Sequence, residues 1–336
     1  MHNVGIIGTG AYVPERVLTN ADLEKKVDTS DEWIVSRTGI RERRISETDV
    51  PVSELCILAG EKALAQVGMD PQELDLVIVT TITPDYLFPA TACLVAERLG
   101  AKKAAAFDLE AGCTGFVYGM VTAAQFIASG MYRTVLVIGG DALSKVLDWE
   151  DRSTCILFGD GAGAAILGRV PEGYGLLESE LGADGSGADL LLQKAGGSRY
   201  PANLETVSNK EHVLQMAGSE VFKFAVRIVE SVSMSVLQKA GLKQADVDWF
   251  IPHQANARII EAAVKRLDMD QKRVVSNLDR FGNMSAASIP VALDEIVRAG
   301  KVKNGDHILF VGFGAGLTWG ASVLRWYERK EGDGNR

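Results

Sequence analysis

An internal repeat constrains the fold of this chain more than any other feature of its sequence. Residues 62–79 read KALAQVGMDPQELDLVIV, and residues 235–252 read SVLQKAGLKQADVDWFIP. In each segment a helical pattern ends at a glycine and is followed by a turn and an apolar run typical of a buried strand. Offset by 173 residues, the two segments align Leu64 with Leu237, Gly68 with Gly241 and Asp75 with Asp248. The chain therefore contains one helix–turn–strand unit twice.

Two further pairs of segments follow in the same order. Residues 113–139 and 283–312 each contain a helical pattern ending at a glycine and then an apolar run. Residues 158–167 (FGDGAGAAIL) and 313–324 (FGAGLTWGASVL) each contain a glycine-rich turn and a final apolar run. Three matched pairs in one order indicate a duplicated architecture.

The repeat predicts an α/β fold of two similar halves packed about a pseudo-twofold axis. We assign residues 1–172 to the first half and residues 173–330 to the second, with the junction near residues 170–178. The length of 336 residues agrees, because single cores usually stop growing near ~250–300 residues. Equivalent positions face each other across such an axis, so Cys113 and Asn283 are expected to be neighbours at a site between the halves.

Charge, cysteines and apolar runs exclude several classes of protein. The net charge of −9 argues against a nucleic-acid partner. Cys56, Cys93, Cys113 and Cys155 include no C-x-x-C pair, so neither a disulfide framework nor a metal site is indicated. The longest apolar runs, such as residues 135–138, are far shorter than the ~18 residues of a membrane span. With no secretory signal before the first strand-like run, we expect a cytoplasmic protein.

Cys113 is the candidate nucleophile. It lies in DLEAGCTGF (residues 108–116), where a strand-like run ends at small residues and a helical pattern begins. A thiol at a helix N-terminus lies at the positive end of the helix dipole, which lowers its pKa and favours the thiolate. Taken alone, the motif also fits a buried core cysteine at a tight turn.

His253 is the candidate catalytic histidine. In IPHQAN (residues 251–256) an apolar run ends at a proline, and polar residues then open a helix. This order places His253 at the carboxyl end of a strand, where α/β proteins build their sites. A hydrogen-bonded loop histidine is the alternative interpretation. We interpret His2, His212 and His307 as structural or solvated.

Asn283 completes the candidate set. In FGNMS (residues 281–285) an asparagine follows a glycine, a pattern typical of a turn or a helix cap. The repeat favours a role in the site, because it places Asn283 opposite Cys113. The glycine-rich turns at residues 158–163 and 312–316 fit either simple turns or backbone N–H groups that face an anion or a developing oxyanion.

The three motifs together resemble β-ketoacyl-acyl-carrier-protein synthase III, the initiating condensing enzyme of bacterial type II fatty-acid synthesis. The motifs are A-x-C-x-G-F, P-H-Q-A-N and G-N-x-S-A-A-S, in that order. The likeness extends over residues 18–45, 151–165 and 312–320, and so covers nearly the whole chain. It implies the thiolase-like fold, with layers α-β-α-β-α.

The resemblance implies a decarboxylative condensation of an acyl-CoA primer with malonyl-acyl-carrier protein. Cys113 would be acylated, and His253 and Asn283 would donate hydrogen bonds to the malonyl thioester carbonyl as carbon dioxide leaves. Backbone N–H groups of Cys113, Gly314 and Ala315 would form the oxyanion hole. Coenzyme A thioester is then a substrate, and no cofactor or metal is implied.

The resemblance also implies binding residues. Those expected at the coenzyme A channel are Trp33 and Arg152, which would hold the adenine between them, together with Arg37, Asn256 and Phe222. Phe88 would reach across a homodimer interface into the partner's acyl pocket. The residues expected to dock the acidic acyl carrier protein are Arg258, Lys223, Lys265, Arg266 and Gln254; for the charged ones, a solvated helix face is the alternative.

Departures from the family pattern leave the acyl primer open. Gly112 and Thr114 flank Cys113, Met284 follows Asn283, and Ala315 stands where a glycine is usual. Two other functions stay in view: a related condensing or acyl-transfer enzyme of secondary metabolism, and a non-catalytic module that binds acyl groups or carrier protein.

Overall fold

Two mixed sheets form the frame of the molecule. The structure, a computed structural model, describes residues 2–329. The first sheet has the strand order β1 (Val4–Tyr12), β7 (Asp160–Arg169), β6 (Val135–Ala142), β4 (Leu76–Thr80) and β5 (Ala105–Leu109). The second has the order β8 (Gly175–Ala183), β13 (Thr318–Arg325), β12 (His307–Gly314) and β11 (Trp249–Pro252).

The two sheets repeat one pairing pattern. In the first, β7 pairs antiparallel with β1 and β6, and β6 pairs parallel with β4. In the second, β13 pairs antiparallel with β8 and β12, and β12 pairs parallel with β11. The fifth strand, β5, has only an isolated parallel bridge between Phe250 and Val274 as its counterpart. This correspondence confirms the predicted pair of similar α/β halves.

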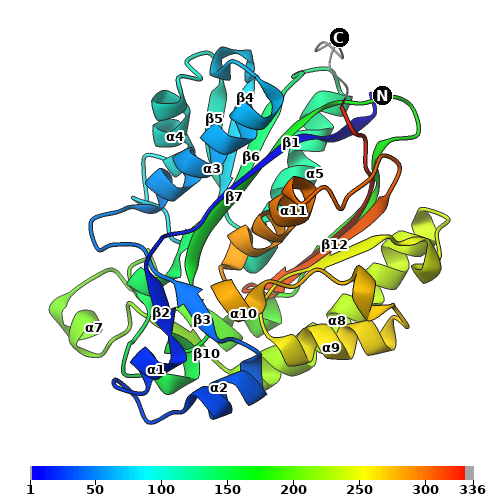
Figure 1. The fold of residues 1–336 in the computed structure, drawn as a ribbon. Coiled ribbons are helices and arrows are strands. Elements are labelled where there is room, and N and C mark those ends of the chain that lie inside the picture. The colour runs from blue at the N-terminus through cyan, green and yellow to red at the C-terminus, as the bar shows by residue number, and fades with distance from the viewer. Residues whose placement is uncertain (1, 330–336) are drawn as a thin grey trace.

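Helices separate and cover the sheets (Figure 1). The long helices are α3 (Val52–Val67) and α4 (Thr91–Leu99) outside the first sheet, α5 (Gly115–Ala128) and α11 (Ser288–Arg298) between the sheets, and α8 (Gly218–Lys239) and α9 (Ala257–Arg266) outside the second. The predicted α-β-α-β-α layers are therefore confirmed. The shorter elements are α1 (Asn20–Leu23), α2 (Asp31–Thr38), α6 (Arg152–Cys155), α7 (Leu204–Ser208), α10 (Leu278–Phe281), β2 (Val17–Thr19), β3 (Glu42–Arg44), β9 (Leu191–Gln193) and β10 (Leu214–Met216).

The aligned residues of the repeat have equivalent structural roles in the two halves. Gly68 and Gly241 follow α3 and α8 with φ of +62° and +71°, a conformation that favours glycine at a helix end. The Asp75 carboxylate accepts a hydrogen bond from the N–H of Thr134 at 3.1 Å, just before β6. The Asp248 carboxylate accepts one from the N–H of His307 at 2.9 Å, at the start of β12. Each aspartate thus ties the beginning of its strand to the neighbouring strand.

One hydrophobic core is shared by both halves. Phe116 of α5 and Leu293 of α11 are buried together with Ile78 of the first sheet and Phe310 of the second. The predicted junction between residues 172 and 173 lies in the turn between β7 and β8. The division into two units there stays a prediction, since the middle layer belongs to both.

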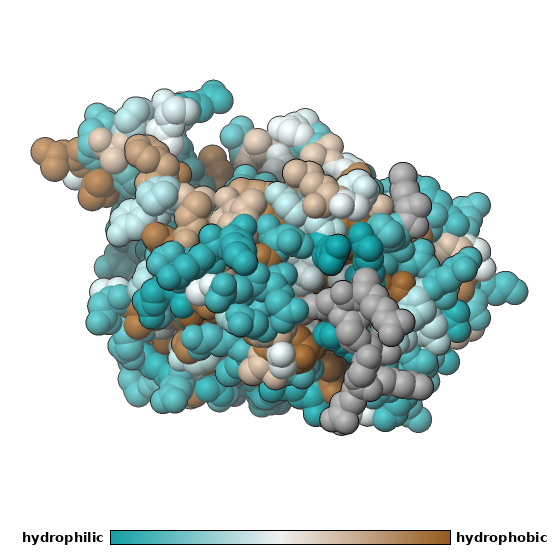
Figure 2. All heavy atoms as spheres, turned by 90° about the horizontal axis from the view of Figure 1, so that it is seen from above, coloured by the Kyte–Doolittle hydropathy of each residue, from teal (hydrophilic) through white to brown (hydrophobic). Residues whose placement is uncertain are grey.

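The surface in Figure 2 is mostly hydrophilic, with apolar side chains scattered or gathered at one projecting end. None of the helices formed by residues 2–329 combines the length and the apolar character needed to span a bilayer.

Candidate active site

Cys113 lies where the chain passes from β5 into α5. A single 3-10 turn, Gly112–Thr114, leads directly into the helix, so the cysteine occupies the helix N-terminus that the sequence predicts. Gly112 has φ +54°, and a Cβ at this position would lie 3.0 Å from the nitrogen of Ala315. Only glycine combines this backbone conformation with so close an approach.

His253 follows β11 directly. Its N–H donates a hydrogen bond to the carbonyl of Val311 at 2.8 Å, which continues the pairing of β11 with β12. The imidazole is 1% exposed and meets the Phe313 ring edge-on, with centroids 5.3 Å apart. Its Nδ1 is buried without a hydrogen-bond partner among the described residues.

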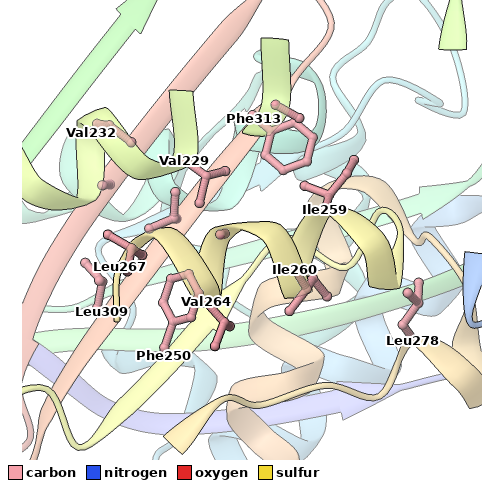
Figure 3. Close-up of a cluster of buried hydrophobic side chains, with 14 of the residues drawn as sticks. Val229, Val232, Phe250, Ile259, Ile260, Val264, Leu267, Leu278, Leu309 and Phe313 are labelled. Carbon is pink, nitrogen blue, oxygen red and sulfur yellow. The ribbon is translucent and has the colours of Figure 1, made fainter. Parts of the chain in front are cut away.

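Helix α9 fixes the segment that carries His253. Ile259, Ile260 and Val264 lie on the face of α9 that packs against Phe250 of β11 and Val229 of α8 (Figure 3). Their spacing is that of an amphipathic helix with one apolar face. The strand before His253 and the helix after it are thus both held by the same core.

Asn283 is held by three hydrogen bonds and by burial. Its N–H donates to the carbonyl of Leu157 at 2.8 Å, and its carbonyl accepts from the N–H of Gly159 at 2.9 Å. Its side-chain Oδ1 accepts from the N–H of Ser285 at 2.8 Å. The side chain is 6% exposed. Because Oδ1 is engaged, the Nδ2 donor of the amide is left for another partner.

Cys113, His253 and Asn283 line one cavity of about 740 Å³. A second cavity of about 320 Å³ also reaches Cys113, and its other walls include Ile82, Leu143, Val146 and Leu214. Two spaces therefore meet at the sulfur: a large one that reaches the surface helices and a smaller one with mainly apolar walls. The repeat correctly predicted that Cys113 and Asn283 come together.

Burial controls the protonation of the site. Burial raises the pKa of the Cys113 thiol to about 12; the Ser285 hydroxyl opposes this shift and the Asp141 charge adds to it. The pKa lowering that we expected from the helix N-terminus is outweighed by desolvation of the buried sulfur. Burial also lowers the pKa of His253 to about 3, so its imidazole is neutral at physiological pH.

Trp33 and Arg37, which were expected at a coenzyme A channel, line the large cavity. The guanidinium of Arg152 lies 4.9 Å from the centre of the Trp33 ring, and that of Arg37 lies 6.0 Å from it. Arg152 also donates to the carbonyl of Asp28 at 2.6 Å. An adenine between Trp33 and Arg152 thus requires Arg152 to move off the indole.

Asn256 and Phe222 line the same cavity. The Asn256 side chain caps α9 by accepting from the N–H of Arg258 at 2.9 Å, and it donates to the carbonyl of Arg37 at 3.1 Å. Arg258 stacks over the Phe222 ring at 5.5 Å. Phe88 lies elsewhere: its side chain is 86% exposed, outside the lining of both cavities.

The charged residues predicted to dock the carrier protein fall into two groups. Arg258 and Lys223 line the large cavity. Lys265 and Arg266 lie at the other end of α9, about 10–12 Å along its axis, and Arg266 pairs with Glu230 at 2.6 Å.

Gln254 is wrong as a docking residue, because it is fully buried. Its Nε2 donates to the carbonyls of Pro252 and Val275, and its Oε1 accepts from Ser276 and Asn277. The glutamine therefore holds the chain around His253 rather than meeting a partner.

The first glycine-rich turn has a structural role. Asp160, which begins β7, accepts hydrogen bonds from the N–H and hydroxyl groups of Ser46 and Ser144. The same turn contributes Phe158 to the lining of both cavities. The second turn approaches the cysteine most closely: a Cβ on Gly314 would lie 2.7 Å from the nitrogen of Cys113. Within residues 2–329, no group of three or more His, Cys, Asp or Glu side chains is placed to hold a metal ion.

Sequence reasoning missed two buried polar residues beside Cys113. They are Asp141, at the end of β6, and Ser285, two residues after Asn283. Ser285 belongs to the FGNMS motif that also contains Asn283. No feature of the sequence assigned it a role, and only the folded structure shows that its side chain lies at the site. Asp141 interrupts an otherwise apolar strand, which is the signal that could have drawn attention to it.

Comparison with known proteins agrees with this geometry. The sequence model for 3-oxoacyl-[acyl-carrier-protein] synthase III matches residues 107–185, and that for the C-terminal part of these enzymes matches residues 237–326. A β-ketoacyl-[acyl-carrier-protein] synthase III of Desulfitobacterium hafniense strain Y51 is 65% identical over 329 residues, which are 98% of this chain and 99% of the relative.

Solved structures show the same likeness. β-Ketoacyl-[acyl-carrier-protein] synthase III of Thermus thermophilus has a TM-score of 0.91 and 50% identity, covering 97% of this chain and 100% of that one. The priming β-ketosynthase of the R1128 polyketide biosynthetic pathway has a TM-score of 0.91 but only 38% identity, over 98% of each chain. The resemblance carried by the motifs around Cys113, His253 and Asn283 is thereby confirmed, and the chain belongs to the 3-oxoacyl-[acyl-carrier-protein] synthase III family.

Proposed function

We propose that this chain starts fatty-acid synthesis by condensing an acyl-CoA primer with malonyl-acyl-carrier protein. Carbon dioxide leaves the malonyl group, and the product is 3-oxoacyl-acyl-carrier protein. Family membership at 65% identity supports the reaction class. The observation that carries the proposal is that Cys113, His253 and Asn283 line a single cavity.

The first step is acylation of Cys113. Its sulfur attacks the thioester carbonyl of the acyl-CoA, and coenzyme A leaves as a thiolate that takes a proton from water. The close approach of Gly314 to the nitrogen of Cys113 supports an oxyanion hole made of backbone N–H groups of Cys113, Gly314 and Ala315. The apolar cavity of about 320 Å³ beside the sulfur is suited to hold the acyl chain.

The second step is decarboxylation. His253, kept neutral by burial, and Asn283, whose Oδ1 is engaged by Ser285, each have one N–H donor to offer to the malonyl thioester carbonyl. Two such donors stabilise the enolate that forms as carbon dioxide leaves. The enolate carbon then attacks the acyl carbon on Cys113, and the Cys113 thiolate is released.

The mouth of the large cavity suits acidic ligands. Trp33, Arg37 and Arg152 lie together there and offer a stacking surface and two guanidinium groups to a coenzyme A nucleotide. Arg258 and Lys223 line the same cavity and would meet the acidic acyl carrier protein. Lys265 and Arg266 would contribute only if the carrier protein extends along α9.

We also propose a homodimer. Tyr86, Leu87 and Phe88 are 60%, 82% and 86% exposed, and together they form a projecting apolar loop. Exposed apolar groups of this size mark protein interfaces. Phe88 would enter the acyl pocket of the partner subunit.

The function is tested with purified protein, malonyl-acyl-carrier protein and a panel of acetyl-, isobutyryl- and isovaleryl-CoA. We expect consumption of the malonyl substrate and release of carbon dioxide with at least one primer. Mass spectrometry should show one acyl group on Cys113 in the wild type and none in Cys113→Ala. Equal labelling of both proteins would contradict the role of Cys113, and the absence of condensation with every primer would contradict the function.

A related acyl transfer in secondary metabolism is the second candidate. The 38% identity to a priming ketosynthase of a polyketide pathway favours it less than the 65% identity to a β-ketoacyl-acyl-carrier-protein synthase III. Acylation of Cys113 without use of malonyl-acyl-carrier protein would favour this candidate. Binding of acyl-CoA without acylation would favour a non-catalytic module.

A further inference from the structure

Ser285 has an unusual conformation for a fully buried serine. Its φ is +49°, in the left-handed region that disfavours residues with a side chain. Such a conformation costs about 1–2 kcal/mol for an L-residue, and glycine would avoid the cost. A strained residue at a reactive site suggests that its side chain is needed there.

The Ser285 hydroxyl lies between two ionisable groups. Ser285 and Cys113 line the smaller cavity together, and the hydroxyl lowers the pKa of the Cys113 thiol. On the other side it lowers the pKa of the Asp141 carboxyl, and the next N–H, of Ala286, donates to Asp141 Oδ2 at 3.2 Å. In the resting site, the buried Oγ has no hydrogen-bond partner among the described residues, so the hydroxyl is not committed to another group.

Asp141 is a buried carboxylate that is held by donors but lies outside the proposed chemistry. It is 0% exposed, and its Oδ1 accepts from the hydroxyls of Thr81 and Thr83 and from the N–H of Ile82, each at 2.9 Å. Burial raises the pKa of the carboxyl, and these hydrogen bonds oppose the rise. A carboxylate in this state can accept a proton more readily than an exposed one.

We propose that Ser285 and Asp141 form a proton relay for Cys113. The Cys113 S–H proton passes to the Ser285 hydroxyl oxygen while the Ser285 O–H proton passes to Oδ2 of the Asp141 carboxylate. The S–H bond breaks, an O–H bond forms on Asp141, and the thiol and carboxylate become a thiolate and a carboxylic acid. Ser285 acts on the reacting sulfur directly, and Asp141 acts as a positioning residue through it.

The relay rests on the proposed acyl transfer and completes its proton balance. Asp141 keeps the proton while Cys113 is acylated. When condensation releases the Cys113 thiolate, the proton returns through Ser285 and the enzyme is reset. No oxidant, reductant or further reactant is required.

Other ionisable groups near the sulfur are poorer acceptors. His253 faces Cys113 across the large cavity, but burial keeps its pKa near 3. Glu110 lines the smaller cavity, but it is exposed, and its Oε1 already accepts from the N–H of Gly112 at 3.2 Å. Behind Asp141, Cys56 is a buried thiol whose pKa is also raised.

The test is the pH profile of Cys113 alkylation by iodoacetamide, which requires no acyl-CoA. Peptide mass spectrometry separates Cys113 from Cys93, an exposed thiol in the same chain that serves as internal control. In the wild type, proton exchange between thiol and carboxylate should give a rate at Cys113 that is nearly independent of pH in the neutral range.

Ser285→Ala and Asp141→Asn should each abolish this plateau. Their rates should rise about tenfold per pH unit and be about 10²-fold slower than the wild type at pH 7, the usual contribution of a general base. The rate at Cys93 should be unchanged. A Ser285→Ala profile that superimposes on the wild type would overturn the relay.

Three further variants keep the test decisive. Ser285→Gly tolerates the φ of +49° and removes the hydroxyl together with its CH2 group, so it replaces Ser285→Ala if that variant folds poorly. Ser233→Ala removes another fully buried serine hydroxyl in α8 and should keep the plateau. Loss of the plateau in Glu110→Gln alone would identify Glu110 as the acceptor and overturn the proposal.

Malonyl-acyl-carrier-protein decarboxylation separates a proton role from a structural one. In a Cys113→Ala background, Ser285→Ala should leave decarboxylation unchanged, because the N–H that holds Asn283 is retained. An equal loss there would show that Ser285 only supports Asn283. If the wild type shows the plateau but is never acylated by acyl-CoA, the proposed function fails while the relay stands.

Discussion

At the scale of single residues, burial sets the resting protonation of the site. The same loss of water that keeps the Cys113 thiol protonated also keeps the His253 imidazole neutral. A neutral imidazole still has one N–H group to donate to a thioester carbonyl. The protonated thiol, in contrast, must lose its proton before it can attack, which is the problem that Ser285 and Asp141 solve in our proposal.

The pKa of His253 predicts how stability depends on pH. The folded pKa of about 3 lies below the ordinary value of 6.5, so the unfolded state binds the proton more readily. This contribution to stability is present above pH 6.5 and is lost as the pH falls towards 3. Between pH 7 and pH 5 we expect His253 to remove about 2 kcal/mol from the free energy of unfolding, measured by urea titration.

His253→Gln is the matched control for this prediction. The variant lacks the titrating ring but has a side chain that can still form hydrogen bonds, so its loss of stability between pH 7 and pH 5 should be about 2 kcal/mol smaller. An identical pH dependence in both proteins would show that the ring is not buried as described.

Asn283→Ala should separate the two proposed half-reactions. The variant should still be acylated by acyl-CoA, because its amide does not act on the acyl-CoA thioester. Condensation should fall about 10²–10³-fold, the usual cost of one lost donor to a developing oxyanion. Mass spectrometry of the acyl-enzyme and product formation from malonyl-acyl-carrier protein measure the two steps. Normal condensation would show that Asn283 is only a turn residue. The control is Asn304→Ala, the same substitution at an exposed site, which should leave both steps unchanged.

At the scale of elements, the site depends on how closely two backbones meet. The end of β12 lies against the start of α5, where Gly314 faces the nitrogen of Cys113 and Gly112 faces Ala315. Helix periodicity put Arg258, Lys265 and Arg266 on one face of α9, but only the first of them lines the cavity. The periodicity of a helix indicates which side chains share a face. It cannot indicate which other parts of the molecule lie beside the two ends of the helix.

Gly314→Ala should distort this contact. The new Cβ would lie 2.7 Å from the nitrogen and 2.9 Å from the Cβ of Cys113, and neither atom can move freely. We expect a loss of about 1–3 kcal/mol in the free energy of unfolding, together with a large loss of Cys113 acylation. Gly197→Ala, where a Cβ meets no atom within 4 Å, should be neutral within about 0.5 kcal/mol. Full acylation of the Gly314→Ala enzyme would contradict the proposed oxyanion hole.

At the scale of the whole molecule, duplication explains both the core and the place of the site. The middle helices α5 and α11 come from different halves and share one core with both sheets. The segments before these two helices carry Cys113 and Asn283. The pseudo-twofold arrangement that packs the two helices together therefore also brings these two residues to one cavity. Several apolar side chains lie outside this core, among them those of the loop that carries Phe88.

The proposed homodimer predicts what happens when the apolar side chain of Phe88 is removed from that loop. The chain has a mass of 36.1 kDa, so the wild type should scatter light as a particle of twice that mass. Phe88→Ser should weaken the dimer and change the acyl-CoA preference, since Phe88 would line the partner's pocket. Leu204→Ser, which alters another side chain that is 89% exposed, should do neither. A monomeric wild type would contradict the proposal.

Local patterns in the sequence predicted much of this architecture. The apolar runs that end the repeated segments 62–79, 113–139, 235–252 and 283–312 correspond to β4, β6, β11 and β12. Each of these runs follows a helical pattern that ends at a glycine, which can be read directly from the chain. The repeat then predicted the meeting of Cys113 and Asn283, because equivalent segments of two similar halves occupy equivalent places.

The sequence by itself determined the two α/β halves and the meeting of Cys113 with Asn283, since both follow from periodicity and repetition along the chain. The family resemblance of the motifs then added His253. Only the tertiary structure decided how those residues ionise, that Gln254 is buried and that Asp141 and Ser285 lie beside the sulfur. Desolvation depends on which atoms the folded chain places around an ionisable group. The same holds for contacts between residues far apart in the sequence, such as Ala286 and Asp141, which are 145 residues apart. No local pattern contains that information.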